Sequence, residues 1–302
     1  MMPRAVTAET VTEEELDRLT RVPRRHVGRW VSAAIVLLLV CFVIVSFAQG
    51  NIDWSVVGQY LTDSTILKGL VSTVVMTFMA MFVGIAIGVV SAVMRLSENP
   101  VLRWISLGYV WLFRGIPQLL QLYIWYNLAL VFPKLGIPGI AETSTVHLMT
   151  PLVATVLGLG LCQGAYTSEV VRAGILSVDR GQIEAGQGIG MSRMLVLRRI
   201  ILPQAMRIIL PPVGNEFISM VKLTSLASAI QFTEILHSAQ NIYFVSGKVM
   251  ELLFVATFWY VVVVSLLSIG QHFIEKRFSR GHGVARTKRR PAGGPQVQEA
   301  AV

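Results

Sequence analysis

The stretch IEAGQGIGMSRMLVLRRIILPQ, residues 183–204, is polar, rich in glycine and basic, and it interrupts a chain that is otherwise mostly apolar. Of the 302 residues, 54% are hydrophobic and only 14% are charged, whereas ordinary soluble domains carry about 25% charged residues. This composition indicates an integral membrane protein. The stretch is therefore expected to connect two membrane spans.

Six apolar runs approach or reach the length of about 20 residues that a helix needs to cross the hydrocarbon core. They cover residues 31–48, 69–93, 115–132, 150–171, 208–230 and 252–270. The fifth run is the least apolar, because it contains Asn215, Glu216, Ser219 and Lys222. In the second run, Gly84 and Gly88 are four residues apart, a spacing that allows close helix packing. We therefore expect an all-α membrane protein with five or six spanning helices.

The basic residues are distributed unevenly between alternate connections. The N-terminal extension 1–30 and the loop 172–207 hold six arginines each, the link 94–103 holds two, and the tail 276–290 holds seven Lys or Arg residues. The other three connections hold one lysine each. Because basic loops stay in the cytoplasm, both termini and the opening stretch are expected there. The net charge of +9 thus indicates membrane topology and gives little support to nucleic-acid binding.

The link between the second and third runs permits two interpretations. Residues 100–113 form either a helix in the cytoplasmic interface, with a bend at Gly115 and Pro117, or the start of a long third helix. The interfacial interpretation is favoured for two reasons. Pro117 disfavours helix at Ile116, and an arginine deep in the membrane, in this case Arg114, is energetically costly.

The opening stretch divides into two expected helices. A short helix at residues 182–187 should end at Gly188 and Gly190, because glycine tolerates the turn conformation. Ser192 is a good N-cap for the second helix, and Pro203 should bend the chain before the fifth run. Two roles remain open for this loop: a linker that packs under the helices, or a docking element for a cytosolic partner.

The same loop resembles the signature of one transporter family. Permease subunits of binding-protein-dependent ABC importers carry the pattern Glu-Ala-Ala, three residues, Gly, nine residues, then Ile-x-Leu-Pro. With both gaps correct, the matching residues here are Glu184, Ala185, Gly186, Gly190, Ile200, Leu202 and Pro203. Gly186 stands where alanine is usual, which should loosen the short helix by up to about 1 kcal/mol.

The resemblance extends over residues 55–275 and is most specific in three further stretches. These are FRGIPQLLQL (113–122), AYTSEVVRAGILSVDRGQIEA (165–185) and NEFISMVKLTSLASAI (215–230). They are similar to the subfamily that imports polar and charged amino acids. Many members carry an acidic residue after the lysine at 222, where this chain has Leu223. The resemblance therefore does not imply a basic amino acid as the cargo.

The resemblance implies a type I ABC importer fold and a division of labour between subunits. The permease domain would cover residues 31–275, with the coupling loop at 173–207 and a basic tail at 276–302 that we expect to be disordered. Residues 184–190 would form the coupling helix that docks on a separate ATPase. Since the chain contains no GxxxxGK[ST] motif, ATP and Mg²⁺ would be bound by that partner, and this chain would be a non-catalytic subunit without a cofactor of its own.

The resemblance also implies the remaining partners and the location. A second permease subunit, identical or homologous, an extracytoplasmic solute-binding protein, an amino-acid substrate and membrane lipid are expected to contact the chain. The expected location is the bacterial plasma membrane. The two cysteines and five histidines show no ligand spacing, so no metal site is expected.

The fifth run supplies the best candidates for a substrate pathway. At 100° per residue, Asn215, Ser219 and Lys222 lie within about 60° of one another on a helix, and polar groups at membrane depth usually face a wet cavity. Lys222 could meet the carboxylate of an amino acid and Glu216 its ammonium group. Alternatively, these groups satisfy one another or the backbone. Further candidates in the same region are Thr224 and Ser225.

Two pairs of residues spaced three apart have both a structural and a functional interpretation. Gln118 and Gln121 could line the pathway, but hydrogen bonding inside the bundle is the favoured interpretation. Glu169 and Arg172 are expected to form a local ion pair, with a gate or hinge that includes Arg114 as the second interpretation.

Two other classes of protein compete with the importer permease. A self-sufficient secondary transporter or channel for a small polar solute would leave the cytoplasmic loop without a purpose. An intramembrane enzyme is the weakest alternative, because the sequence contains no HExxH motif, no acidic pair at membrane depth and no Ser/His constellation.

Overall fold

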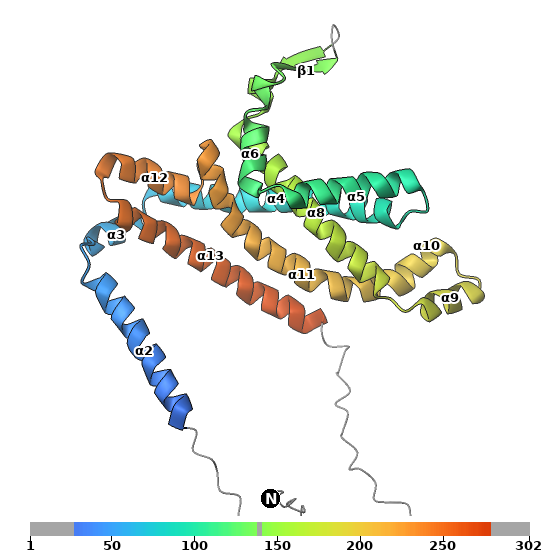
Figure 1. Ribbon diagram of the computed structural model, residues 1–302, viewed down its shortest axis with the longest axis horizontal. Coiled ribbons are helices and arrows are strands. Elements are labelled where there is room, and N and C mark those ends of the chain that lie inside the picture. Colours follow the sequence, from blue (N-terminus) through green and yellow to red (C-terminus); the bar gives the residue numbers. More distant parts are fainter. Residues whose placement is uncertain (1–26, 138–140, 279–302) are drawn as a thin grey trace, which may run out of the picture. The chain divides into compact units, whose positions relative to one another are not determined.

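The computed structural model describes residues 27–137 and 141–278, and the described chain is almost entirely helical (Figure 1). It divides into two compact units, Met1–Ile52 and Asp53–Val302. The described part of the first unit consists mainly of one helix, α2 (Val27–Ala48), and none of its apolar span is buried within the protein. This exposure fits a helix surrounded by lipid.

The second unit begins with α3 (Trp54–Tyr60), which is followed by the long helix α4 (Ser64–Leu96). A second long helix, α13 (Val249–Phe278), ends the described part of the chain. The elements between them are α5 (Pro100–Gly115), α6 (Gln118–Tyr126), η1 (Leu128–Leu130), β1 (Lys134–Ile137), β2 (Ala141–Ser144), α7 (Thr145–Leu148), α8 (Pro151–Leu176), α9 (Arg180–Gly188), α10 (Arg193–Val196), η2 (Leu197–Ile201), α11 (Leu202–Leu223), η3 (Thr224–Ile230) and α12 (Ile235–Ser246).

Close packing of α4 against α8 forms the centre of the second unit. A Cβ atom on Gly84 would lie 2.8 Å from the Cβ of Gln163, and one on Gly88 would lie 2.7 Å from the Cβ of Thr167. The pair of glycines thus brings the two backbones together, as their spacing predicted. Helices α6 and α11 pack on this pair, and the shared core contains Ala80, Met81, Leu122, Ala154, Leu159, Met220 and Ile230.

A second core joins α12 and α3 to the ends of α4 and α13. Its buried members are Ile66, Ile235, Ala239, Leu252, Val255 and Ala256. Glu234 is fully buried here and caps α12, since its carboxylate accepts hydrogen bonds from the amides of Leu236 and His237. Its Oε2 also accepts from the Tyr260 hydroxyl of α13, at 2.5 Å. This buried carboxylate therefore fixes α12 to α13.

The N-terminus of α3 is capped in the same way. Asp53 Oδ1 accepts hydrogen bonds from the amide and hydroxyl groups of Ser55. The Ser55 hydroxyl lowers the pKa of the Asp53 carboxyl below its usual value. Trp54 packs against Phe254 of α13 with ring centroids 5.4 Å apart, so this short helix is held against the last span.

Three helices of the described residues are long and apolar enough to span a membrane, namely Gly28–Ala48, Ser64–Leu96 and Val249–Arg277. They match the predicted first, second and sixth spans. The predicted fourth and fifth spans correspond to α8 and to α11 followed by η3, which are long but less apolar. The total of six spans stays a prediction.

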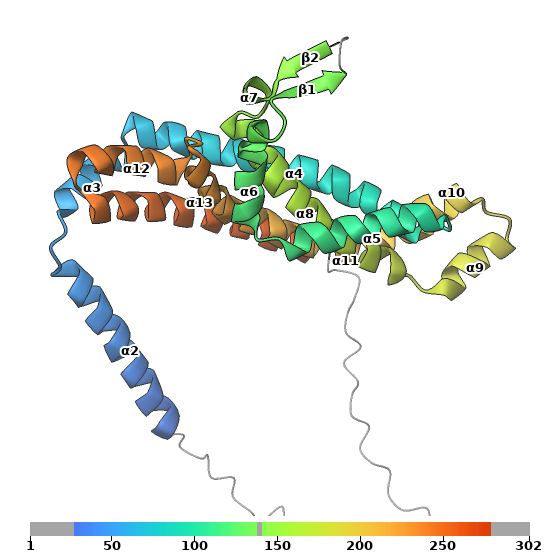
Figure 2. The same ribbon diagram turned by 45° about the horizontal axis from the view of Figure 1, so that its top comes forward.

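The third predicted span, residues 115–132, is not one continuous helix. Helix α6 ends at Tyr126, and the Tyr123 carbonyl accepts from both the backbone and the side-chain amide of Asn127, at 3.0 and 2.9 Å. The chain then forms η1 and a β-hairpin of β1 and β2 that the apolar pattern did not predict. In both Figures 1 and 2, the hairpin projects away from the long helices.

Helix α5 lies beside α4 and α8 rather than across their ends, as both views show. The Ser106 hydroxyl is 2.8 Å from that of Ser91 on α4, and the Tyr109 hydroxyl donates to the Leu161 carbonyl of α8 at 2.6 Å. Helix α5 thus packs along α4 and α8, and its place relative to the membrane interface stays a prediction. The expected break is present, since Ile116 is extended before Pro117.

Candidate functional site

The cytoplasmic loop of the prediction forms a short, regular helix with its own cap. Helix α9 begins after Asp179, whose carboxylate accepts a hydrogen bond from the Gln182 amide at 3.2 Å. The helix covers the predicted residues 182–187 and one turn more. Glu184 is exposed on it and forms no ion pair within the residues that the structure describes.

A turn closed by two backbone hydrogen bonds ends α9. The Met191 amide donates to the Gly186 carbonyl at 3.1 Å, and the Gly190 amide donates to the Gln187 carbonyl at 2.9 Å. This is a Schellman motif, in which the residue after the C-cap adopts a left-handed conformation. Gly190 occupies that position with φ +84°. Gly188, in contrast, is an ordinary helical residue, so only one of the two predicted stop glycines needs its conformational freedom.

The loop rests on a small hydrophobic core formed by the ends of α4 and α8 and the start of α11. Its buried members are Ala92, Val171, Val178, Ala205 and Ile209, with Ile183 and Ile200 packed against them. The Gln204 side chain donates to the side-chain oxygen of Gln182 at 2.7 Å and so joins α11 to α9. Because of these contacts, α9 is held as a fixed protrusion with Glu184 on its exposed side. In Figure 2, α9 and α10 lie at the end of the bundle farthest from α12.

The second helix of the loop continues directly into the fifth span. Ser192 caps α10 as predicted, since its hydroxyl accepts from the Leu195 amide at 3.4 Å. The chain then forms a π-helical turn, η2, whose wider spacing lets the Leu202 amide bond to the Leu197 carbonyl. Pro203 follows as the second residue of α11. The chain stays helical through Pro203, and it bends between α10 and α11 at this π turn, as Figure 1 shows.

Gly186 is buried against the second half of the loop. A Cβ atom at this position would lie 2.7 Å from Cδ1 of Ile200 and 3.5 Å from the sulfur of Met191. The first distance is too short for an undisturbed contact, but the atom that it involves is the flexible end of a side chain. An alanine at position 186 would therefore require the end of the Ile200 side chain to shift.

We expect Gly186→Ala to change the melting temperature of the purified protein very little. The gain in helix propensity, about 1 kcal/mol, is offset by the displacement of Ile200. Adding Ile200→Val, which removes the conflicting methyl group, should convert the alanine into a stabilising change. The matched control is Ile200→Val alone, which should be destabilising by about 0.5–1.5 kcal/mol. A double variant less stable than this control would contradict the packing described here.

Three of the predicted pathway residues form a polar stripe on α11. Asn215, Ser219 and Lys222 are all exposed, and their spacing places them on one face of the helix. None of their side chains has a hydrogen bond or ion pair to another described residue. Thr224 and Ser225 are not part of the stripe, because their hydroxyl groups donate to the Val221 and Lys222 carbonyls at the helix end. The stripe is therefore the largest set of free polar groups on this span.

Glu216 faces the interior of the protein, away from this stripe. Its Oε2 accepts hydrogen bonds from the Gln163 amide at 2.6 Å and from the Thr167 hydroxyl at 3.0 Å, both on α8. Gln163 and Thr167 are themselves buried. Glu216 thus joins α11 to α8 through partners that neither interpretation of this residue included. Lys222 and Glu216 do not form a common site within this chain.

The two predicted glutamines also bond inside the bundle. Gln121 is buried, and its side-chain amide donates to the carbonyls of Phe113 and Ile116 at 2.9 Å. It thus supplies hydrogen-bond donors to carbonyl groups at the end of α5, where the helix provides none. Gln118 donates to the sulfur of Cys162 on α8 at 3.2 Å. Their favoured interpretation is therefore consistent with the structure.

Glu169 is the centre of a cluster of arginines. Arg172 donates to its Oε2 at 3.1 Å, as the spacing predicted. Arg95 at the end of α4 donates to its Oε1, and Arg114 approaches the same oxygen at 3.8 Å while it lies over the Tyr166 ring. Arg114 therefore has an ion-pair partner at the depth of α8, which lowers the cost of its position. The carboxylate joins α4, α5 and α8.

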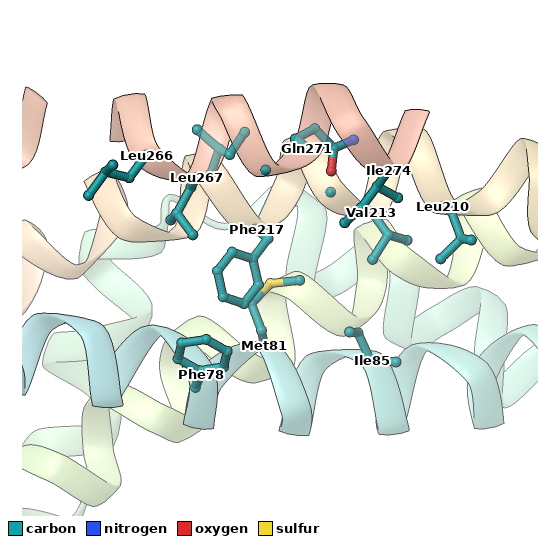
Figure 3. A pocket seen from close by; sticks show the side chains of 13 residues that line it. Phe78, Met81, Ile85, Leu210, Val213, Phe217, Leu266, Leu267, Gln271 and Ile274 are labelled. Atoms are coloured by element: carbon teal, nitrogen blue, oxygen red, sulfur yellow. The ribbon is translucent and has the colours of Figure 1, made fainter. Parts of the chain in front are cut away.

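An apolar pocket of about 350 Å³ lies between α4, α11 and α13 (Figure 3). Phe78, Met81 and Phe217 line it, and Gln271 supplies a polar side chain at its edge. The Gln271 amide donates to the Pro211 carbonyl at 3.0 Å and to Glu275 at 2.9 Å. The pocket walls are too apolar for a charged amino acid, and the polar stripe of α11 does not line it.

Gly214 allows Gln271 to reach α11. A Cβ atom on Gly214 would overlap the Gln271 amide group. We expect Gly214→Ala to destabilise the protein by about 1–3 kcal/mol, measured as thermal unfolding in detergent. Gln271→Ala should remove most of this cost when the two are combined. Gly270→Ala is the matched control on the facing helix, because a Cβ there meets nothing within 4 Å. Additive effects in the double variant would contradict the overlap.

Several of these contacts were not predicted from the sequence. The partners of Glu216, the pairing of Arg95 with Glu169, and the Gln271 contact to α11 all join residues far apart in the chain. A charged residue inside an apolar run indicates that a partner is needed, but the run does not identify it. The local elements, such as the caps at Asp179 and Ser192, depend on residues only two or three positions away.

The chain matches a known family over most of its length. Residues 84–280 match the family described as binding-protein-dependent transport system inner membrane component. This region begins within α4 and includes α9, the polar stripe and α13.

Two curated relatives are similar over most of both chains. The arginine transport system permease protein ArgU of Corynebacterium glutamicum is 40% identical over 262 residues, which are 86% of this chain and 83% of that protein. The L-cystine transport system permease protein TcyB of Bacillus subtilis is 37% identical over 230 residues, 76% of this chain and 92% of that protein.

Solved structures show the same fold. A chain of a crystallised amino acid ABC transporter is 31% identical, has a TM-score of 0.65, and is covered completely by 76% of this chain. A chain of the MetNI methionine ABC transporter has a TM-score of 0.56 at 19% identity, with 71% of this chain and 96% of that chain covered, and it supports the fold alone. Taken with the family match and the loop that carries Glu184, these similarities show that the chain belongs to the family of binding-protein-dependent transport system inner membrane components, as a permease subunit of an ABC importer.

Proposed function

We propose that this permease subunit forms the translocation pathway for an amino acid and couples its movement to ATP hydrolysis by a separate subunit. The observation that carries the proposal is the exposed helix α9, which is fixed by a cap, a Schellman turn and its own core. Glu184 is exposed, and no described residue forms an ion pair with its carboxylate. A rigid protrusion with an unpaired charge is suited to a groove on another protein.

The partner at α9 would be an ATP-binding subunit that holds the nucleotide and Mg²⁺. This chain contains no phosphate-binding loop of the GxxxxGK[ST] type, so its own role would be non-catalytic. In α9, Glu184 and Ala185 would face the groove of the ATPase, while Gly186, Gly190, Leu202 and Pro203 would position them. A solute-binding protein outside the cell and a second permease subunit would complete the assembly.

The polar stripe of α11 is the proposed pathway surface. Asn215, Ser219 and Lys222 are exposed and have no partner in the described chain, so a second permease chain that faced them would enclose a polar channel. The Lys222 ammonium could hold the carboxylate that every free amino acid carries. Glu216 would act indirectly, since its carboxylate is occupied by Gln163 and Thr167. The names of ArgU and TcyB, which differ in cargo, support the class of substrate and not one amino acid.

The proposed location is the bacterial plasma membrane, with both termini in the cytoplasm. The excess of Lys and Arg in alternate connections supports this orientation, and the same excess places α9 on the side where ATP is available.

We expect Lys222→Met to reduce the initial rate of amino-acid uptake about tenfold or more, the value of one hydrogen bond to a charged group. The test uses proteoliposomes that contain the permease, its ATPase and the binding protein. Radiolabelled substrate is supplied at a saturating concentration. Lys68→Met, which removes an exposed lysine from the start of α4, is the control and should transport normally. Equal rates for Lys222→Met and the control would contradict the proposed pathway.

The same vesicles test the proposed function itself. Uptake should require ATP and the partner ATPase. Substrate accumulation in vesicles that lack the ATPase would favour the alternative, a self-sufficient secondary transporter or channel, and would overturn the coupling role of α9.

A further inference from the structure

A second cavity, of about 290 Å³, lies where α4, α5 and α8 meet. Its lining residues are Arg95, Leu96, Arg103, Leu107 and Arg172. We refer to it as the arginine pocket. It is separate from α9 and from the polar stripe, and neither the coupling nor the pathway proposed above uses it.

The arginine pocket carries an excess of positive charge. Its three arginines are opposed by one neighbouring carboxylate, Glu169, which pairs with Arg95 and Arg172, so that three positive charges and one negative leave two positive. Arg114 approaches the same carboxylate at 3.8 Å and adds to the excess. Arg103 is exposed and has no ion pair among the described residues. Glu98, in the link between α4 and α5, does not line the cavity.

Guanidinium groups bind phosphate oxygens through paired hydrogen bonds, and arginine is preferred wherever a phosphate has to be recognised. The volume of about 290 Å³ exceeds that of several water molecules, each of which occupies about 30 Å³. A phosphate group therefore fits the pocket in both charge and size. Two of the three arginines are already held in place by Glu169, which reduces the entropy lost when they bind an anion.

The surroundings of the pocket favour a lipid as the source of the phosphate. Within two turns of Arg95, α4 exposes Val89, Val90 and Val93, of which Val90 is 60% exposed. Next to Arg103, Trp104 is 71% exposed, and tryptophan is enriched where the membrane meets water. Acyl chains could cover such apolar side chains, whereas a soluble anion would leave them exposed. Leu96 and Leu107 supply apolar walls to the pocket itself.

We propose that the arginine pocket binds the phosphate group of an anionic phospholipid from the cytoplasmic leaflet, with Arg103 as the residue that the lipid contacts from the outside. The choice of leaflet rests on the orientation given under the proposed function. Basic pockets between helices on the cytoplasmic side are known to accept anionic head groups. The bound lipid would join α4, α5 and α8 at their inner ends.

The test compares the association of spin-labelled phosphatidylglycerol and phosphatidylcholine with the permease and its ATPase in phosphatidylcholine nanodiscs. The wild-type protein should immobilise phosphatidylglycerol preferentially. Arg103→Gln should weaken this preference about fivefold, since one arginine near an anionic lipid contributes about 1 kcal/mol. Arg103→Glu should abolish it. The control is Arg277→Gln, which removes an exposed arginine at the end of α13, outside the pocket. This variant should leave the preference for phosphatidylglycerol unchanged.

Three results would overturn the proposal. The first is no preference for phosphatidylglycerol in the wild type. The second is an unchanged preference in both Arg103 variants. The third is a loss of preference in Arg277→Gln as large as that in Arg103→Gln. A separate experiment adds inorganic phosphate to the permease and its ATPase in phosphatidylcholine nanodiscs and measures the heat of binding. Saturable binding that Arg103→Gln removes would assign the pocket to a soluble phosphate and would overturn the lipid as ligand. Because these measurements need no transport, they are independent of the proposed function.

Discussion

Glu184→Ala is expected to weaken the docking of the ATPase on the permease by about thirtyfold or more, and ATP-dependent uptake should fall by a similar factor. The carboxylate is exposed on α9 without a partner in the described chain. Its loss should therefore not affect the fold of the permease, but a charged group buried in the complex would be left unpaired. The measurements are binding of the purified ATPase to permease nanodiscs and uptake in proteoliposomes.

A second exposed glutamate, outside the loop, supplies the control for this experiment. Glu98 is exposed in the link between α4 and α5, and Glu98→Ala should bind the ATPase normally. Membrane insertion and the affinity for the binding protein should be unchanged in both variants. Normal docking by Glu184→Ala would mean that α9 is only a linker that packs under the helices.

Gly190→Pro is expected to abolish coupled transport, because the proline ring fixes φ near −65° and the Schellman turn requires +84°. Without the turn, the hydrogen bonds from Met191 to Gly186 and from Gly190 to Gln187 are lost, and α9 is no longer held at a fixed angle. Gly190→Ala should be milder and destabilise the loop by about 1–2 kcal/mol, the cost of a left-handed conformation for a residue with a Cβ.

Gly188→Ala is the matched control for the alanine variant. A Cβ atom at Gly188 or at Gly190 meets nothing within 4 Å, so the two sites differ in backbone conformation and not in available space. Gly188→Ala should leave uptake unchanged or raise the stability of α9, which hydrogen exchange of the loop would measure. If the two alanine variants behaved alike, the left-handed turn would have no role in coupling.

The sequence predicted the loop well because its structure is determined locally. The cap at Ser192 and the stop at Gly190 each depend on residues within one turn, and the spacing of Asn215, Ser219 and Lys222 needed only the period of a helix. Helix α5 was harder to place. Its packing depends on Ser91 and Leu161, which no local pattern connects to it.

The third apolar run shows the limit of composition as a guide. Residues 115–132 have the hydropathy of a span, yet α6 ends at Tyr126 and the chain continues as η1 and a β-hairpin. Glu216 shows the same limit for the site. Its position in a span predicted a functional group, but the bonds from Gln163 and Thr167, which decide its role, come from another helix.

The π turn before Pro203 has a mechanical consequence. Helices α10, η2 and α11 follow one another without a gap from Arg193 to Leu223, so a movement of α10 is passed directly to α11. Helix α11 alone (Leu202–Leu223) is about 33 Å long at 1.5 Å per residue, and a tilt of about 10° at its first residue would move the other end by about 6 Å. Lys222 lies at that end. A small rotation of a docked ATPase could thus be converted into a large stroke at the proposed cargo contact.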